Sequence, residues 1–84
     1  IVIIMDNEQH IINKAQYIFD IISDLTNNIP PKRLKVLDFG CGDGSFADKL
    51  GGYGFDIYGI DIKNFWNSNQ NIDKSKFKKI RSKN

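Results

Sequence analysis

Three glycines alternate with other residues in a short run whose composition and spacing suit ligand binding. The run covers residues 40–44, with the sequence Gly-Cys-Gly-Asp-Gly. Glycine has no Cβ, so such a backbone can take positive φ and approach a bound molecule closely. A glycine run alone also serves as a plain turn, but here Asp38 precedes it by two residues and Asp61 lies 23 residues after Asp38. The two acids favour a binding site.

The segments around the glycine run predict how it is positioned. Residues 34–39 form an apolar run between proline and glycine, and residues 57–62 are rich in β-branched and aromatic residues, so both are predicted to be strands. Two apolar residues four apart predict a short helix over residues 45–50. A helix between two strands requires a crossover, so residues 34–62 are predicted to form a parallel βαβ unit. The helix then points its free N–H groups at the glycine run.

A longer helix is predicted upstream, over residues 7–29. Its apolar residues recur at spacings of three and four and share one stripe: Ile11, Ile12, Ala15, Ile18, Phe19, Ile22, Leu25 and Ile29. Asp6 and Gln9 resemble a capping box, and Pro30 and Pro31 forbid continuation of the helix. The predicted fold class is α/β, a Rossmann-like βαβ unit with a preceding long helix.

Length and composition limit the class of protein. Eighty-four residues allow one small domain, predicted over residues 1–84, and 40% hydrophobic with 26% charged residues is typical of a globular chain. No run approaches the roughly 20 apolar residues that cross a bilayer, and the apolar start is too short for a signal peptide. One cysteine and one histidine form neither an internal disulfide nor a structural zinc site. We expect a cytoplasmic protein with no metal and no membrane partner.

Charge is divided unevenly along the chain. Residues 1–62 carry five Lys or Arg against nine Asp or Glu, whereas residues 63–84 carry seven against one. Phe77 and Ile80 lie three apart among the lysines, which favours a solvated helix face or a connector over a binding patch. Residues 63–84 are therefore predicted to be a polar loop and a basic tail. Nucleic acid is a partner that this charge permits but does not indicate.

The acids near the glycine run distinguish between classes of ligand. Residues 42–47 formally fit the dinucleotide pattern GxGxx(G/A). However, Asp38 and Asp43 would repel a pyrophosphate, by about 1 kcal/mol or more for each close, partly desolvated contact. The site favours a cationic ligand without phosphate, such as S-adenosyl-L-methionine. Asp61 is then placed to accept both ribose hydroxyls, and Ile62 beside it to cover the adenine.

Two segments resemble the first two sequence motifs of the class I S-adenosylmethionine-dependent methyltransferases. They are residues 36–46 (Val-Leu-Asp-Phe-Gly-Cys-Gly-Asp-Gly-Ser-Phe) and residues 58–62 (Tyr-Gly-Ile-Asp-Ile). The first contains the whole family pattern of two hydrophobic residues followed by Asp-x-Gly-x-Gly-x-Gly. The resemblance covers roughly residues 10–62 and concerns cofactor binding only.

The resemblance implies a set of residues that bind S-adenosyl-L-methionine: Asp38, Gly40, Cys41, Gly42, Gly44, Asp61 and Ile62. It implies that Asp38 and the backbone of residues 40–42 lie against the methionine part. Gly44 would begin the helix beneath it, and Asp61 would take the ribose. No catalytic residue, methyl acceptor or oligomeric state is assigned.

The chain is shorter than that family's complete domain, which has seven strands. We therefore expect residues 1–84 to be a partial domain that is inactive alone. We expect two strands, with the strand at residues 34–39 keeping an unpaired edge that the fourth strand would cover in the full fold. The residues at the methyl acceptor would then lie elsewhere.

Two other functions stay open. An NAD-type dinucleotide-binding fragment of an oxidoreductase fits Gly42, Gly44 and Ala47 together with the acid after the second strand. A non-catalytic interaction module would act through the basic tail or an exposed helix. Cys41 is not predicted to be a nucleophile, because no histidine or other base is near it in sequence.

Several single residues have simple structural interpretations. Trp66 and Phe65 are predicted to anchor a loop against the sheet, with stacking on adenine or substrate as the alternative. His10 is interpreted as a surface residue and Tyr17 as boundary packing. For the two acids, the structural alternatives are that Asp38 solvates the loop amides and that Asp61 caps the next turn.

Overall fold

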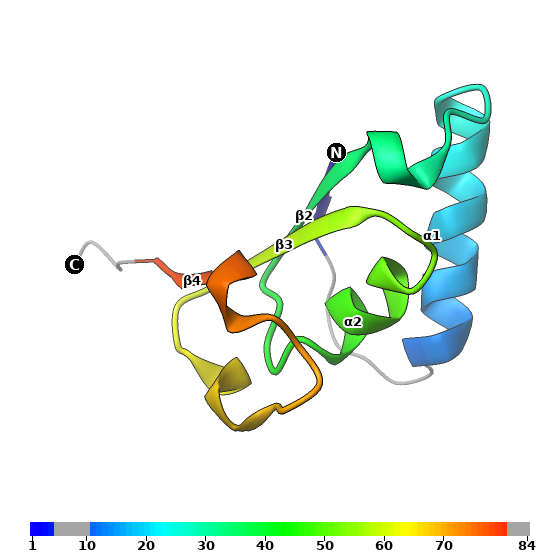
Figure 1. The fold of residues 1–84 in the computed structure, drawn as a ribbon. Helices are drawn as coiled ribbons and strands as arrows, with labels where there is room; N and C mark the ends of the chain where they lie inside the picture. The colour runs from blue at the N-terminus through cyan, green and yellow to red at the C-terminus, as the bar shows by residue number, and fades with distance from the viewer. Residues whose placement is uncertain (5–10, 81–84) are drawn as a thin grey trace.

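A four-stranded parallel sheet organises the computed structural model, which describes residues 1–4 and 11–80 (Figure 1). The helices and strands, in chain order, are β1 (Val2–Ile4), α1 (Ile11–Leu25), β2 (Lys35–Phe39), α2 (Ser45–Gly51), β3 (Asp56–Asp61) and β4 (Phe77–Lys79). Three short 3-10 helices connect them: η1 (Pro31–Arg33), η2 (Phe65–Ser68) and η3 (Lys74–Lys76). The strand order is β1-β2-β3-β4, and each neighbouring pair is parallel. The predicted α/β class is confirmed.

The predicted βαβ unit is the centre of this fold. β2, α2 and β3 lie within one residue of the predicted segments, and β2 pairs with β3 in parallel, with Leu37 opposite Tyr58. Alternate residues of each strand point to the helices, so Val36 and Ile57 are buried beside Ala47 of α2. Because parallel strands end at the same edge of a sheet, the segments after β2 and β3 lie side by side.

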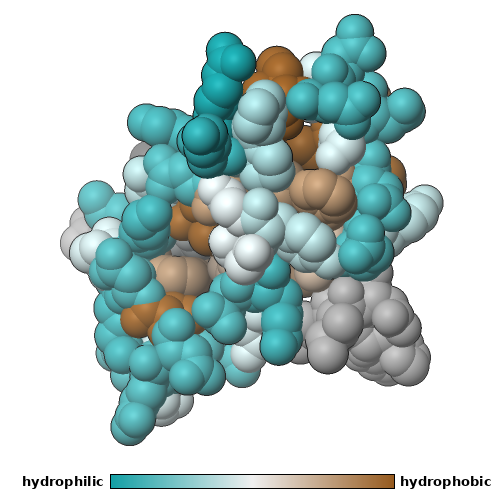
Figure 2. All heavy atoms as spheres, turned by 45° about the vertical axis from the view of Figure 1, so that its right-hand side comes forward, coloured by the Kyte–Doolittle hydropathy of each residue, from teal (hydrophilic) through white to brown (hydrophobic). Residues whose placement is uncertain are grey.

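The two α-helices, α1 and α2, lie on one side of the sheet (Figure 1). Their contacts with the strands form a single apolar core of Ala15, Ile22, Val36, Ala47, Leu50, Phe55 and Ile57. Tyr53 stacks on Phe19 of α1 with ring centroids 4.5 Å apart, and its hydroxyl donates to Gln16 Oε1 at 2.8 Å. Figure 2 shows the molecule turned so that the side with α1 faces the viewer more directly. The surface in this view is mainly hydrophilic, with hydrophobic residues in small separate patches.

The C-terminal end of α1 differs from the prediction. The helix ends at Leu25 rather than at residue 29, because Asn27 and Asn28 take left-handed conformations with φ of 61° and 63°. Leu25 is 78% exposed and Ile29 is 39% exposed, so placing them on the buried stripe was wrong. Boundary packing of Tyr17 was also wrong, since that side chain is 66% exposed. The predicted helix start, with its capping box and His10, lies outside the described residues.

Two strands escaped the sequence analysis, so the expectation of a two-stranded sheet was wrong. β1 pairs with β2, with Val2 opposite Leu37, and occupies the edge that was predicted to be unpaired. β4 pairs with β3, with Phe77 opposite Gly59, so reading this part of the tail as a helix face or a connector was wrong. Each new strand has only three residues, too few to show a strand-like periodicity.

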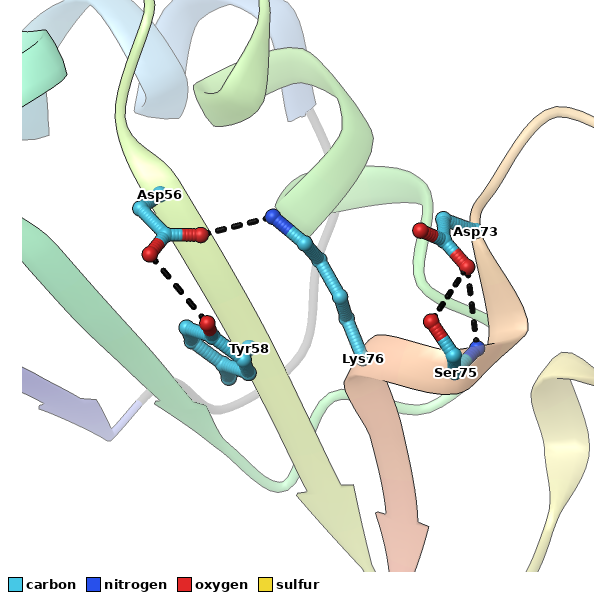
Figure 3. A network of polar contacts seen from close by, with 5 residues as sticks. All are labelled: Asp56, Tyr58, Asp73, Ser75 and Lys76. Atoms are coloured by element: carbon cyan, nitrogen blue, oxygen red, sulfur yellow. Dashed lines mark hydrogen bonds and ion pairs between the residues drawn. The ribbon is translucent and has the colours of Figure 1, made fainter.

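A polar network fastens η3 and β4 to β3 (Figure 3). Lys76 Nζ lies 2.6 Å from Asp56 Oδ1 and 5.2 Å from the centroid of the Tyr58 ring. The Tyr58 hydroxyl donates to Asp56 Oδ2 at 3.2 Å, and hydrogen bonding to Lys76 lowers the pKa of the Asp56 carboxyl. On the η3 side, Asp73 Oδ1 accepts bonds from the amide and the hydroxyl of Ser75. These contacts fix the start of β4 against the sheet.

The opposite face of the sheet carries apolar side chains that no described helix covers. Val2 is 59% exposed, Phe39 43% and Tyr58 36%. Their registers place Val2 and Tyr58 on either side of Leu37, so they form one exposed row. Among residues 1–4 and 11–80, no helix is long and apolar enough to span a membrane.

Candidate functional site

The glycine run leaves the carboxyl end of β2 and turns into α2. Its three glycines, Gly40, Gly42 and Gly44, have φ of 83°, 57° and 82°, in the left-handed region that favours glycine. The amides of Gly40 and Cys41 both donate to the Ile60 carbonyl, at 2.8 and 3.0 Å, which ties the start of the loop to β3. The amide of Gly44 donates to the Cys41 carbonyl at 3.0 Å and closes the turn.

The loop has one open side and one packed side. A Cβ added to Gly40 or Gly42 would have no atom within 4 Å, so the backbone there borders open space. A Cβ added to Gly44 would come within 3.1 Å of Ile72 and Phe77. A ligand therefore has access to the first two glycines, whereas the third is covered by the connection between β3 and β4.

The Asp61 carboxylate is held by backbone amides on both oxygens. Oδ2 accepts from the Gly42 amide at 2.8 Å, and Oδ1 accepts from the Ile62 amide at 2.6 Å. A carboxylate has about four lone-pair positions, so each oxygen keeps capacity for another donor. The bond from the Ile62 amide agrees with the structural interpretation that Asp61 caps the following turn. The two bonds still leave the Asp61 carboxylate able to accept from a pair of hydroxyl groups.

The Asp38 carboxylate is buried without a hydrogen-bond partner among the described residues. Its side chain lies at the end of β2 and is 2% exposed. Burial, reinforced by the negative charge of Asp61, raises the pKa of Asp38 from 3.8 to about 6. Asp38 does not solvate the loop amides, because the first two donate to Ile60 and the amide of Gly42 donates to Asp61.

The Cys41 thiol is buried against β3, in surroundings that lower its reactivity. It is 6% exposed, and burial together with Asp38 and Asp61 raises its pKa to about 12. Its sulfur atom faces Gly59 of β3, where a Cβ would approach it to 2.8 Å. A thiol with this pKa stays protonated near neutral pH, which argues against a nucleophilic role.

The aromatic residues after β3 have different environments. Trp66 is 4% exposed and its ring centroid lies 5.7 Å from that of Phe77, so its predicted role as a loop anchor is confirmed. Phe65 is 50% exposed, and the same prediction was wrong for it. Ile62 is 55% exposed and directly follows Asp61, so its side chain presents apolar surface beside the site.

The sequence analysis missed the residues that hold the loop from the side of the β3–β4 connection. Asn69 donates through Nδ2 to the carbonyl of Asp43 at 2.7 Å, and Ile72 lies against Gly44. The composition of residues 63–71 indicated a polar loop, but four asparagines occur in it and nothing local distinguishes Asn69. Only the tertiary contact identifies this residue.

Three carboxylates therefore surround an open glycine backbone at the carboxyl ends of parallel strands. Asp38 is buried, Asp43 accepts from the Ser45 amide at 2.9 Å, and Asp61 accepts from two amides. None of the three forms an ion pair with another residue that the structure describes. The arrangement suits a ligand that brings positive charge and hydroxyl donors, and it disfavours a phosphate.

Comparison with known proteins identifies the family of the chain. A family model described as a methyltransferase domain matches residues 9–83, nearly the whole chain. Searches of curated proteins and of solved structures found no match. The matched span includes the glycine run, both acids at the strand ends and the β3–β4 connection. The chain therefore belongs to the family of methyltransferase domains, which places it among the transferases.

Proposed function

We propose that this chain binds S-adenosyl-L-methionine as the cofactor-binding part of a methyltransferase. The observation that carries the proposal is the carboxyl of Asp38, which is 2% exposed and has no hydrogen-bond partner among the described residues. A buried carboxylate is costly unless an opposite charge or hydrogen-bond donors compensate it. The sulfonium and ammonium groups of this cofactor supply that charge, and it carries no phosphate for the acids to repel.

The other residues of the site fit the remaining parts of the cofactor. Asp61, held by two amides, keeps one acceptor position on each oxygen for the two ribose hydroxyls. The open backbone at Gly40 and Gly42 leaves room for the methionine part. The exposed side chain of Ile62 lies where it would cover one face of the adenine.

The chemistry follows from position more than from acid or base groups. When bound, the cofactor would supply a methyl group on a sulfonium, so that a bond from the acceptor to the methyl carbon would form as the methyl–sulfur bond breaks and the neutral thioether leaves. The residues of this chain hold the cofactor in place so that an acceptor meets the methyl carbon in line. Asp38 and Asp61 anchor its two ends, and neither takes part in a bond that forms or breaks. The methyl acceptor is left unassigned.

Titration calorimetry tests the proposal. S-adenosylmethionine, S-adenosylhomocysteine and NADH are titrated separately into the full chain at pH 7.5. We expect both adenosyl compounds to bind and NADH not to bind, because Asp38 and Asp43 repel a pyrophosphate. Binding of NADH in place of the adenosyl compounds would favour a dinucleotide-binding function. Binding of none of them by the folded protein would overturn the cofactor assignment.

A matched pair of variants locates the binding. Asp61→Ala removes the proposed ribose contact and should weaken S-adenosylmethionine severalfold or more. Asp48→Asn removes an exposed carboxylate of α2 that makes no side-chain hydrogen bond to a described residue, and it should leave the affinity unchanged. Equal affinities for the wild-type protein and Asp61→Ala would remove Asp61 from the site.

A further inference from the structure

We propose that Asn69 is a positioning residue that fixes the conformation of the glycine loop. Asn69 belongs to the β3–β4 connection, and its Nδ2 donates to the backbone carbonyl of Asp43 at 2.7 Å. The part of the inference that concerns affinity rests on the function proposed above, but the part that concerns loop conformation does not.

The Asp43–Gly44 peptide makes one hydrogen bond inside the loop and one to Asn69 outside it. Asp43 stands between Gly42 and Gly44, both of which have positive φ. Glycine accepts either sign of φ at little cost, so sterics restrict the φ of Gly44 little, and hydrogen bonds must set the orientation of this peptide. The Gly44 amide donates to the Cys41 carbonyl within the loop, and the Asp43 carbonyl accepts from Asn69 outside it. Rotation of the peptide would break both bonds, so the Asn69 bond stabilises the observed orientation from outside the loop.

Two other polar groups of the loop, the Gly42 amide and the Asp43 carboxylate, have partners other than Asn69. The Gly42 amide donates to Asp61, and the Asp43 carboxylate accepts from the amide of Ser45 at 2.9 Å. The first bond ties the loop to β3 and the second ties it to the start of α2. The Asn69 bond ties it to the β3–β4 connection.

Asn69 is itself held in place, so it can transmit position to the loop. Its Oδ1 accepts from the Asn71 amide at 2.9 Å, and its own amide donates to the Trp66 carbonyl at 2.9 Å. Its carbonyl accepts from Lys74 Nζ at 2.9 Å. Trp66 is buried against Phe77 of β4, so the chain of contacts runs from the sheet to the loop.

Three variants separate this role from a general effect on folding. Asn69→Asp keeps the acceptor for the Asn71 amide and nearly the same shape, but it removes the donor to Asp43. Asn69→Ala removes both groups. Asn67→Ala is the matched control, because Asn67 is exposed in the same connection, its amide donates to the Asn64 carbonyl, and its side chain makes no hydrogen bond to a described residue.

The measurements are the amide resonances of Gly42, Gly44 and Ser45 in the ligand-free protein, the affinity for S-adenosylmethionine and the thermal midpoint. We expect both Asn69 variants to shift these resonances and to weaken binding about three- to tenfold, with the midpoint close to wild type. The control should match the wild-type protein. The added negative charge in Asn69→Asp would by itself favour a cationic ligand, so weaker binding in that variant cannot be a charge effect.

Unchanged resonances in both Asn69 variants would overturn the proposal. Shifted resonances with unchanged affinity would overturn its functional part. A loss of affinity that parallels the loss of thermal stability in all three variants would also overturn it, in favour of a merely structural residue. If the wild-type protein binds no S-adenosylmethionine, the proposed cofactor fails, and the resonances alone still decide whether Asn69 sets the loop.

Discussion

Two connections meet at the glycine loop and are fixed by different means: the β2–β3 connection, which contains the loop, and the β3–β4 connection, which packs against it. The first contains α2, whose Ala47 and Leu50 are completely buried. The second spans residues 62–76 and contains two 3-10 helices, a single buried tryptophan and side-chain hydrogen bonds at its surface. One connection is fixed by apolar packing and the other by a few specific contacts.

This difference separates stability from local order. Loss of packing under α2 removes part of the only apolar core that the described residues share, so it should destabilise the whole chain. Loss of a contact in the second connection should release the loop and β4 and leave the core in place. The following experiments test that separation, from the largest expected effect to the smallest.

Leu50→Ala should have the largest effect, because the Leu50 side chain of α2 is completely buried in the apolar core. Substitutions of this kind cost about 2–5 kcal/mol of folding free energy. Urea unfolding followed by circular dichroism measures the loss. A variant as stable as the wild-type protein would show that α2 is not packed as the structure has it.

Asp38→Asn should stabilise the ligand-free protein at neutral pH. The pKa of Asp38 is about 6 in the folded chain and near 3.8 when unfolded, so the folded state binds the proton more tightly. Folding stability should therefore fall as pH rises from about 4 to 6, by up to about 1.4 kcal/mol per pH unit. Asn carries no charge, so the variant should lack this slope. Parallel pH profiles of stability for the two proteins would contradict the burial of an ionisable Asp38.

Gly59→Ala tests the packing at β3, where Gly59 lies between Cys41 of the first connection and Phe77, which follows the second. An added Cβ would lie 2.6 Å from the Phe77 ring and 2.8 Å from the Cys41 sulfur, closer than atoms pack. Overpacking of this kind costs about 1–3 kcal/mol. Combining it with Phe77→Leu should restore part of the stability, because a smaller side chain can move aside. Additive losses in this double-mutant cycle would show that Phe77 is not the residue that clashes.

Lys76→Met should have the smallest effect, since the ion pair with Asp56 is solvent-exposed. Exposed pairs of this kind contribute little to stability, because water screens the two charges. We expect little change in overall stability but faster hydrogen exchange of the β4 amides, because the network in Figure 3 holds the start of that strand. Lys78→Met, on the exposed part of β4, is the control. Equal exchange in both variants would argue against this role for the network.

The sequence predicted the first connection well because its signals are local. Proline, glycine and a short apolar run define β2, and two apolar residues four apart define α2. Asp38 and Asp61 followed from their places at the ends of two strands. Their different states did not follow, because the Gly42 amide that holds Asp61 and the packing that buries Asp38 come from residues distant in sequence. Only the Ile62 amide that also holds Asp61 is a local contact.

The second connection could be predicted only in part, for a physical reason. Trp66 suggested an anchor by its size, but β4 depends on Phe77 packing over Gly59, a contact between residues 18 positions apart. The choice of Asn69 among four nearby asparagines depends on the place of the Asp43 carbonyl. A segment held by few specific contacts leaves little periodic pattern in its sequence.

The buried carboxyl of Asp38 also has a consequence for calorimetry. Near pH 6 this group is partly protonated in the free protein, and a cation bound beside it would favour the ionised form. Binding would then release a fraction of a proton into the buffer. The apparent binding enthalpy would vary with the ionisation enthalpy of the buffer, and the slope of that plot would count the protons released by Asp38.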